Sequence, residues 1–107
     1  MLLEKGADVN NEAVYGWTPL LLAALTHVDI VKLLIRKGAD TQAVTKYGWT
    51  ALICASYMGR YETAELLLAK GVDTSAKSSK GLTALDYAKA LENKKLVQLL
   101  TSDSHKK

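Results

Sequence analysis

The tetrapeptide YGWT occurs at residues 15–18 and again at 47–50, and both tryptophans of the chain lie in it. The match extends to YGWTPL at 15–20 and YGWTAL at 47–52, and a weaker echo, KGLTAL, occupies 80–85. The threonines at 18, 50 and 83 are separated by 32 and 33 residues. A repeat of this period is typical of a solenoid, in which similar units stack on one another.

Each unit predicts two short helices. Thr18 and Pro19 are suited to start the first one, because the hydroxyl accepts a hydrogen bond at the N-cap and proline costs nothing in the first turn. Residues 20–25 are almost all apolar, which indicates a helix buried on most sides. Residues 28–37 alternate apolar and polar side chains with helical spacing, so a second, amphipathic helix follows. Gly38 is suited to end it.

The glycine that ends each helix pair lies at a fixed distance from the next threonine. Gly6, Gly38 and Gly71 each precede a threonine by 12 residues. The segments between them are rich in turn-forming residues, which predicts extended loops. Since no helix pair buries its apolar face alone, the units must stack to form one continuous core.

These residues resemble the ankyrin repeat family. The stretches GWTPLLLAA, GADVN and IVKLLIRKGAD carry the resemblance, since the family has a period of 33 and a T-P-L-H-x-A opening. It implies an all-α fold, an ankyrin-repeat solenoid of stacked helix-turn-helix units with β-hairpin-like loops. We expect one domain at 1–102, made of a partial repeat and loop (1–15), two repeats (16–47 and 48–80) and a C-terminal capping repeat (81–102). A polar tail follows at 103–107.

The chain departs from the family pattern in two ways. The histidine of T-P-L-H-x-A is replaced by Leu21, Ile53 and Asp86, so we expect apolar packing to substitute for its hydrogen bonds in the first two units. Unit one is also one residue short at the point where unit two has Gly59 between its helices. The missing residue predicts a tight or strained turn around Thr26 and His27.

The resemblance implies a non-enzymatic protein-protein interaction module with a concave surface. In this family the hairpin tips and the ends of the inner helices line that surface. Trp and Tyr are enriched among the residues that dominate binding energy at interfaces, and several fall in these positions. The predicted partner-binding residues are Tyr15, Trp17, Leu25, Lys46, Tyr47, Trp49, Tyr57, Met58, Lys80, Leu82 and Leu91.

Two alternatives to this interpretation stay open at the level of sequence. The tryptophans could pack only on their own hairpins, in which case the chain is a structural spacer. The repeats could instead be the substrate-targeting or regulatory part of a larger protein or effector whose active domain is absent from this chain. The spacer predicts that replacing the aromatic residues changes no binding.

Composition and charge exclude other classes of function. The net charge of +3 is dispersed, unlike the clustered basic stripe of a nucleic-acid-binding protein. The single cysteine, Cys54, lies in an apolar stretch, which indicates a buried structural thiol. His27 and His105 form no metal-ligand or catalytic pattern with it, so we expect no catalytic residue, metal or cofactor. The longest apolar run is too short to cross a membrane, and we expect an intracellular protein, cytoplasmic or nuclear.

The N-terminus raises two further expectations. Residues 1–8, MLLEKGAD, resemble the second helix of a unit whose first helix is absent. An uncapped stack end exposes apolar side chains, which predicts self-association through this end. The segment LLEKGADVN also resembles the site that asparaginyl hydroxylases modify in ankyrin repeats, which makes Asn10 a candidate for hydroxylation.

Overall fold

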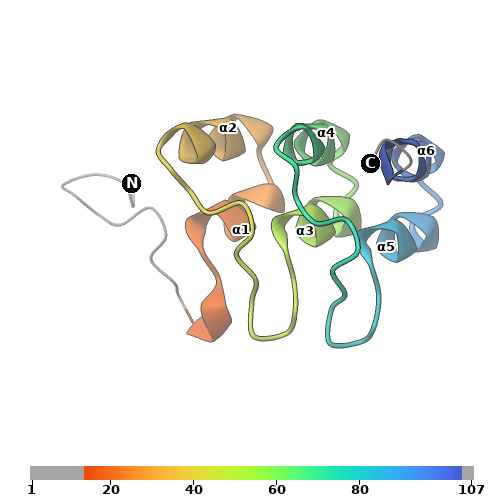
Figure 1. Ribbon diagram of the computed structural model, residues 1–107, viewed down its shortest axis with the longest axis horizontal. Coiled ribbons are helices and arrows are strands. Elements are labelled where there is room, and N and C mark those ends of the chain that lie inside the picture. The colour runs from red at the N-terminus through yellow and green to blue at the C-terminus, as the bar shows by residue number, and fades with distance from the viewer. Residues whose placement is uncertain (1–13, 105–107) are drawn as a thin grey trace.

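The computed structural model describes residues 14–104, which form helices arranged in two layers (Figure 1). Helices α1, α3 and α5 make the inner layer, and α2, α4 and α6 make the outer layer. Each inner helix packs against the outer helix that follows it, and α3 also packs against both α1 and α5. The bounds are η2 Val14–Gly16, α1 Pro19–Ala24, α2 Val28–Arg36, α3 Ala51–Tyr57, α4 Tyr61–Ala69, α5 Ala84–Ala90 and α6 Lys94–Ser104.

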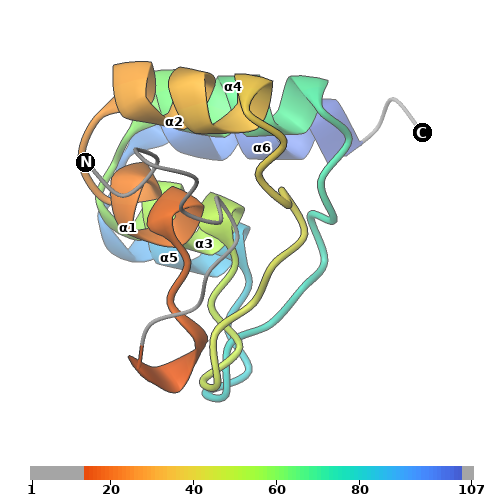
Figure 2. The same cartoon turned by 90° about the vertical axis from the view of Figure 1, so that its left-hand side faces the viewer.

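Long loops join one helix pair to the next and extend away from the two helical layers (Figure 2). Their tips lie side by side along the stack. In residues 14–104 the one β pairing is an isolated antiparallel bridge between Val44 and Thr50. The loops are therefore hairpin-like without forming a sheet. The all-α solenoid predicted from the repeat is confirmed.

Threonine caps begin every inner helix. The hydroxyl oxygens of Thr18 and Thr50 each accept a hydrogen bond, at 3.2 Å, from the backbone N–H of Leu21 and Ile53. Thr83 does the same for Asp86, whose carboxylate in turn accepts the N–H of Thr83 at 2.9 Å. These bonds satisfy N–H groups that a helix N-terminus leaves without partners. The recurring threonine is thus a helix-start signal repeated once per unit.

The three residues that stand where the family has histidine, Leu21, Ile53 and Asp86, lie in different environments. Leu21 and Ile53 are buried in the core that runs through the stack. Asp86 is only partly buried and completes the reciprocal capping box with Thr83. Apolar packing substitutes for histidine in the first two units, and a helix cap replaces it in the third.

The residue missing from unit one shortens α1, which has 6 residues against 7 in α3 and in α5, whereas the turn that follows is as long as the other two interhelical turns. Gly59 and Glu92 occupy matching places in the later turns and have positive φ angles of 70° and 57°. Neither Thr26 nor His27 has a positive φ. The N–H groups of both bond to the carbonyl of Ala23, at 2.9 and 3.0 Å. The expected tightening is therefore not seen in the length of the turn, and its φ angles show none of the left-handed strain that the sequence left open.

Glycine allows the hairpin tips to approach one another closely. Gly48 has φ of 80°, and a Cβ atom there would lie 2.8 Å from the carbonyl oxygen of Lys77 in the next hairpin. Gly16 has φ of 82°, and a Cβ atom there would lie 3.3 Å from the Cα atom of Thr45. Any side chain at Gly48 would force neighbouring hairpins apart. The glycine of YGWT is therefore a stacking residue.

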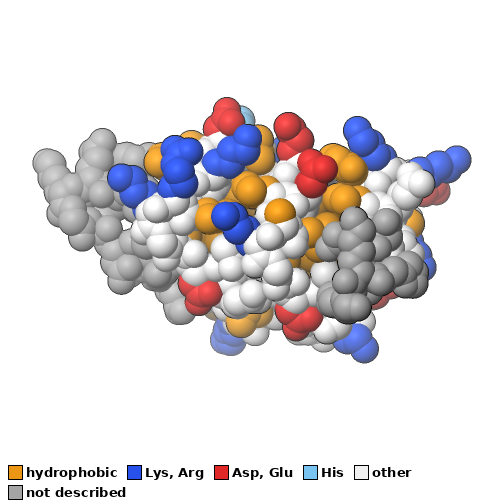
Figure 3. All heavy atoms as spheres, turned by 45° about the horizontal axis from the view of Figure 1, so that its top comes forward, with side chains coloured by type: hydrophobic (Ala, Val, Ile, Leu, Met, Phe, Trp, Pro, Cys, Tyr) orange, Lys and Arg blue, Asp and Glu red, His pale blue; other side chains and the backbone are white. Residues whose placement is uncertain are grey.

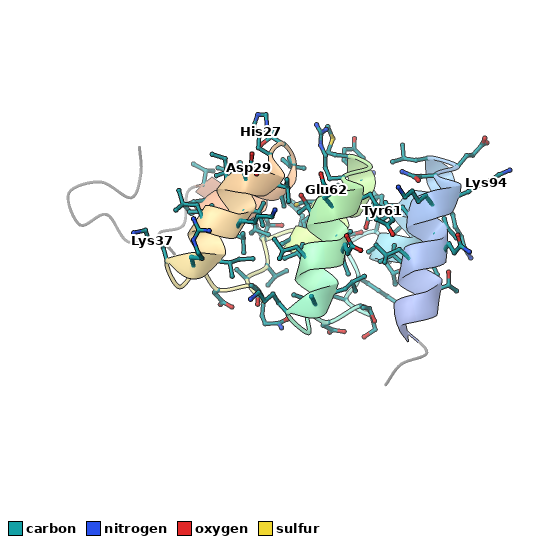
Figure 4. The ribbon with its side chains drawn as sticks, turned by 90° about the horizontal axis from the view of Figure 1, so that it is seen from above. His27, Asp29, Lys37, Tyr61, Glu62 and Lys94 are labelled. Atoms are coloured by element: carbon teal, nitrogen blue, oxygen red, sulfur yellow. The ribbon has the colours of Figure 1, made fainter. Side chains whose placement is uncertain are left out.

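The outer layer presents a mixed polar surface. Figure 3 shows Lys and Arg side chains interspersed with Asp and Glu over α2, α4 and α6. Seen from above, Asp29 of α2 and Glu62 of α4 lie in the first turns of adjacent helices, with Lys94 at the start of α6 (Figure 4). Acidic residues near a helix N-terminus interact favourably with its dipole. Within 14–104 no helix is long and apolar enough to cross a membrane.

Candidate functional site

Backbone hydrogen bonds hold the hairpin tips in a row. The N–H of Lys46 donates to the carbonyl of Tyr15, and the N–H of Ser79 donates to the carbonyl of Tyr47, both at 2.8 Å. Each bond joins one unit to the next. The side chains at the tips are therefore placed on a common, repeating frame.

Buried hydroxyl groups shape the hairpins from inside. The Thr45 hydroxyl accepts the N–H groups of Tyr47 and Trp49 at 3.2 and 3.1 Å. Ser78 takes the matching place in the next hairpin, where its hydroxyl accepts the N–H of Lys80 at 3.3 Å. Since both hydroxyls are buried, these bonds are shielded from water.

Three aromatic rings from two units form a cluster beside the hairpins. The ring centre of Trp49 lies 5.0 Å from that of Tyr57, with the rings edge to face, and 5.2 Å from that of Tyr87. Tyr57 and Tyr87 are 5.8 Å apart, also edge to face. Tyr87 is buried and its hydroxyl lies 2.9 Å from the Ser78 hydroxyl, whereas Tyr57 is 49% exposed. Tyr87 is thus the buried member of the cluster, and Tyr57 is the exposed one.

A second aromatic pair lies at the tips themselves. The rings of Tyr15 and Tyr47 are 5.7 Å apart and tilted by 49°. The ammonium group of Lys46 lies 5.5 Å from the centre of the Tyr15 ring, within the range of a cation–π interaction. Both rings are about half exposed. The pair therefore exposes apolar area at the hairpin tips.

The predicted partner-binding residues divide by exposure into two groups. The partly buried group packs against the core and contributes only part of its side chain to the surface: Trp17, Leu25 and Trp49. The exposed group lies at the tips or at the ends of inner helices: Tyr15, Lys46, Tyr47, Tyr57, Met58, Lys80, Leu82 and Leu91. Whether either group contacts a partner stays a prediction.

Sequence reasoning missed two residues that organise this region. Tyr87 was overlooked because it sits in an apolar helical pattern, although its place four residues after Thr83 matches Cys54 after Thr50. Arg60 extends from the second turn and its Nε donates to the Leu25 carbonyl at 3.1 Å. No sequence signal marks that bond, since it depends on how one turn faces the next.

Among the described residues, the one thiol is buried, and two loop aspartates accept hydrogen bonds from the backbone. Cys54 is fully buried, and burial raises the pKa of its thiol to about 12. Asp40 and Asp73 each accept the N–H of the residue two positions on, at 2.8 Å, as turn-capping aspartates do. Among residues 14–104, His, Cys, Asp and Glu side chains form no group of three that could hold a metal ion.

Asn10 is the residue of the first loop that corresponds to Gln42 and Ser75. It lies outside the described residues, as do the apolar residues proposed to mediate self-association through the N-terminal end. Both expectations therefore stay predictions from the sequence.

A family model described as ankyrin repeats, in three copies, matches residues 1–78. The chain belongs to the ankyrin repeat family. Ankyrin repeats are generally protein-protein interaction modules, and the family is typically non-enzymatic. The family match ends before α5, but α5 and α6 continue the same layers as the earlier ankyrin helices. No curated protein matches the chain.

Proposed function

We propose that this ankyrin chain binds a protein partner through the surface formed by its hairpin tips and the ends of its inner helices. The observation that carries the proposal is the exposure of Tyr15, Tyr47 and Tyr57 on one repeating frame. Met58, Leu82 and Leu91 add exposed apolar area. Exposed apolar residues gathered on one surface are typical of an interaction site.

Rigidity supports the same conclusion. The tips are joined by the inter-unit hydrogen bonds at Lys46 and Ser79, and Tyr57 rests on the buried ring of Tyr87. A surface held in its binding conformation loses little conformational entropy when a partner binds. The aromatic rings would lie near the centre of the interface, with Lys46 and Lys80 at its rim.

The experiment that tests the proposal compares two folded variants in a proteome pull-down. Tyr15→Ala/Tyr47→Ala/Tyr57→Ala removes exposed rings from the proposed surface, and leaves both tryptophans in place. Lys32→Ala/Glu65→Ala/Lys70→Ala is the matched control, because these exposed residues lie on or beside the outer helices α2 and α4. Circular dichroism must show that both variants keep their helices.

Loss of captured partners by the tyrosine variant, with retention by the control, supports a binding role. Equal capture by both variants and the parent chain would leave the chain as a structural spacer. Capture lost only with the outer-helix variant would move the binding surface to the opposite layer.

A further inference from the structure

We propose that the partner of this surface is an extended protein segment in which acidic and large apolar side chains alternate. The inference rests on the proposed function and specifies the chemistry of the ligand. It follows from two sets of exposed side chains, a basic row of lysines on the hairpins and an apolar row at the ends of the inner helices.

The basic row runs along the hairpins. Residues 44–49 and 77–82 contain Lys46, Lys77 and Lys80 and no Asp or Glu. All three lysines are exposed. Because the backbone N–H of Ser79 donates to the carbonyl of Tyr47, the two segments that carry these lysines lie side by side. Lys77 also interacts electrostatically with the carboxylate of Asp86, so Lys46 and Lys80 are the lysines that favour an acidic partner.

The apolar row runs beside it, along the ends of the inner helices. Tyr57 and Met58 at the end of α3 are 49% and 43% exposed, and Leu91 after α5 is 50% exposed. Trp49 lies between the rows, since it belongs to the hairpin and its ring contacts Tyr57. The hairpin side of the surface therefore exposes its lysines together with Val44, Tyr47 and Leu82, and the ends of the inner helices add further exposed apolar residues.

An extended chain fits such a surface. Its successive side chains point to opposite sides, so alternating acidic and apolar residues would face the lysine row and the aromatic row respectively. Adjacent units in a helical stack are about 10 Å apart, which an extended chain spans in about three residues. A short linear segment thus reaches both hairpins.

Single-stranded nucleic acid also combines negative charge with stacking bases. The rings here favour a peptide, because Trp49, Tyr57 and Tyr87 pack edge to face or tilted on one another. Their faces are covered in part by their neighbours, whereas side-chain methyl groups can fill the gaps around Tyr57. An oligonucleotide is therefore a competitor to test rather than the expected ligand.

The test selects binders from a random linear peptide library displayed on phage, using the whole chain as bait. Enriched peptides are synthesised and their affinities measured for the parent chain and three variants. Lys46→Gln/Lys80→Gln neutralises the basic row. Lys32→Gln/Arg36→Gln removes the same charge from exposed positions of α2. Tyr57→Ala removes an exposed ring from the apolar row. Oligo(dT) is added as a competitor in separate measurements.

We expect enriched peptides to alternate Asp or Glu with Leu, Ile, Phe or Trp. Their affinity should fall about tenfold in Lys46→Gln/Lys80→Gln, since two rim ion pairs contribute about that much. It should also fall with added salt and stay within about twofold in the α2 control. Oligo(dT) should not displace them.

Other outcomes overturn the inference in distinguishable ways. Peptides without acidic enrichment that still need Tyr57 would refute the acidic segment and leave the proposed binding function in place. Peptides insensitive to Tyr57 and to both lysines would refute the binding surface as well. Displacement by oligo(dT) through the same lysines would assign the basic row to nucleic acid. A library that yields no binder would refute a linear ligand.

Discussion

The indole ring of Trp49 lies 5.2 Å from the phenol ring of Tyr87, and the two residues belong to different repeats. Trp49 therefore contributes to stacking as well as to the surface. This contact explains why a tryptophan is present beside the hairpin glycine of the second unit. The aromatic residue has a structural role there, whereas the rings of Tyr15, Tyr47 and Tyr57 are about half exposed.

Replacing Trp49 with alanine should lower the free energy of unfolding by about 2 kcal/mol, because a large, partly buried ring is lost from between two repeats. The control Tyr47→Ala removes an exposed ring and should cost less than about 1 kcal/mol. Urea denaturation followed by circular dichroism measures both. Equal losses in the two variants would mean that the contact with Tyr87 contributes nothing to stacking.

Replacing Ser56 with alanine should not destabilise the fold, in contrast to the replacement of Trp49. Its hydroxyl is fully buried and neither accepts nor donates a hydrogen bond. Removing this hydroxyl from water without a new partner costs free energy on folding. Ala24 occupies the same position in the first unit. We expect Ser56→Ala to leave stability unchanged or to raise it by up to about 1 kcal/mol.

The N-cap variant Thr50→Ala, in the same helix, should instead cost about 1 kcal/mol. Denaturant midpoints compare the two directly. A loss of stability in Ser56→Ala as large as in Thr50→Ala would show that the serine hydroxyl has a partner in solution.

Glu92 adopts φ of 57°, where the matching residue of the previous turn is Gly59. The left-handed region costs a residue with a Cβ atom about 1 kcal/mol relative to glycine. Glu92→Gly should therefore raise the melting temperature, and Gly59→Ala should lower it. Differential scanning calorimetry on the pair checks this, and a melting temperature lowered by Glu92→Gly would refute it.

The capping box at the start of α5 makes stability depend on pH. The hydrogen bond from the Thr83 N–H holds the pKa of the Asp86 carboxyl below its ordinary value, with Lys89 and Lys77 adding favourable charge. Since the folded pKa is depressed, the stabilisation is present above the unfolded value of about 3.9 and is lost as pH falls through the folded pKa.

Asp86→Asn should remove this dependence. The difference in stability between the parent chain and Asp86→Asn should be largest near neutral pH and shrink below about pH 4. Thermal melts across pH 2.5–7 would measure it. A difference that grows on acidification would contradict the assigned direction.

Cys54 should be unreactive in the folded chain. It is fully buried and its pKa is raised to about 12, so almost no thiolate is present at neutral pH. A thiol reagent such as 5,5′-dithiobis(2-nitrobenzoate) should react at a rate that rises with urea as unfolding exposes the side chain. Fast reaction in the absence of denaturant would show that α3 opens locally.

The sequence predicts the regular features of the fold because each has a local physical cause. A threonine hydroxyl caps the helix that follows it, and a glycine permits positive φ after the outer helices α2 and α4, at Gly38 and Gly71. The missing residue of unit one was also readable, and the turn at Thr26 and His27 has no left-handed residue to match Gly59 and Glu92.

The candidate surface was predictable only in outline. The repeat gives the positions of the hairpin tips, and hence the rows of Tyr and Lys residues. It does not give how far each ring is covered, because that depends on the neighbouring repeat. Trp17 and Trp49 proved partly buried, whereas Tyr57, in an apolar stretch of α3, is half exposed.

By itself the sequence determined the period, the two helices of each unit, their caps and the stacking of units, all of which follow from residues close together in the chain. Tertiary structure alone decided that Arg60 bonds to the Leu25 carbonyl, 35 residues away, and that Tyr87 supports Trp49 and Tyr57. The physical reason is that such contacts depend on the distance and rotation between successive units. Those quantities are set by the packing of the whole core rather than by any one stretch of residues.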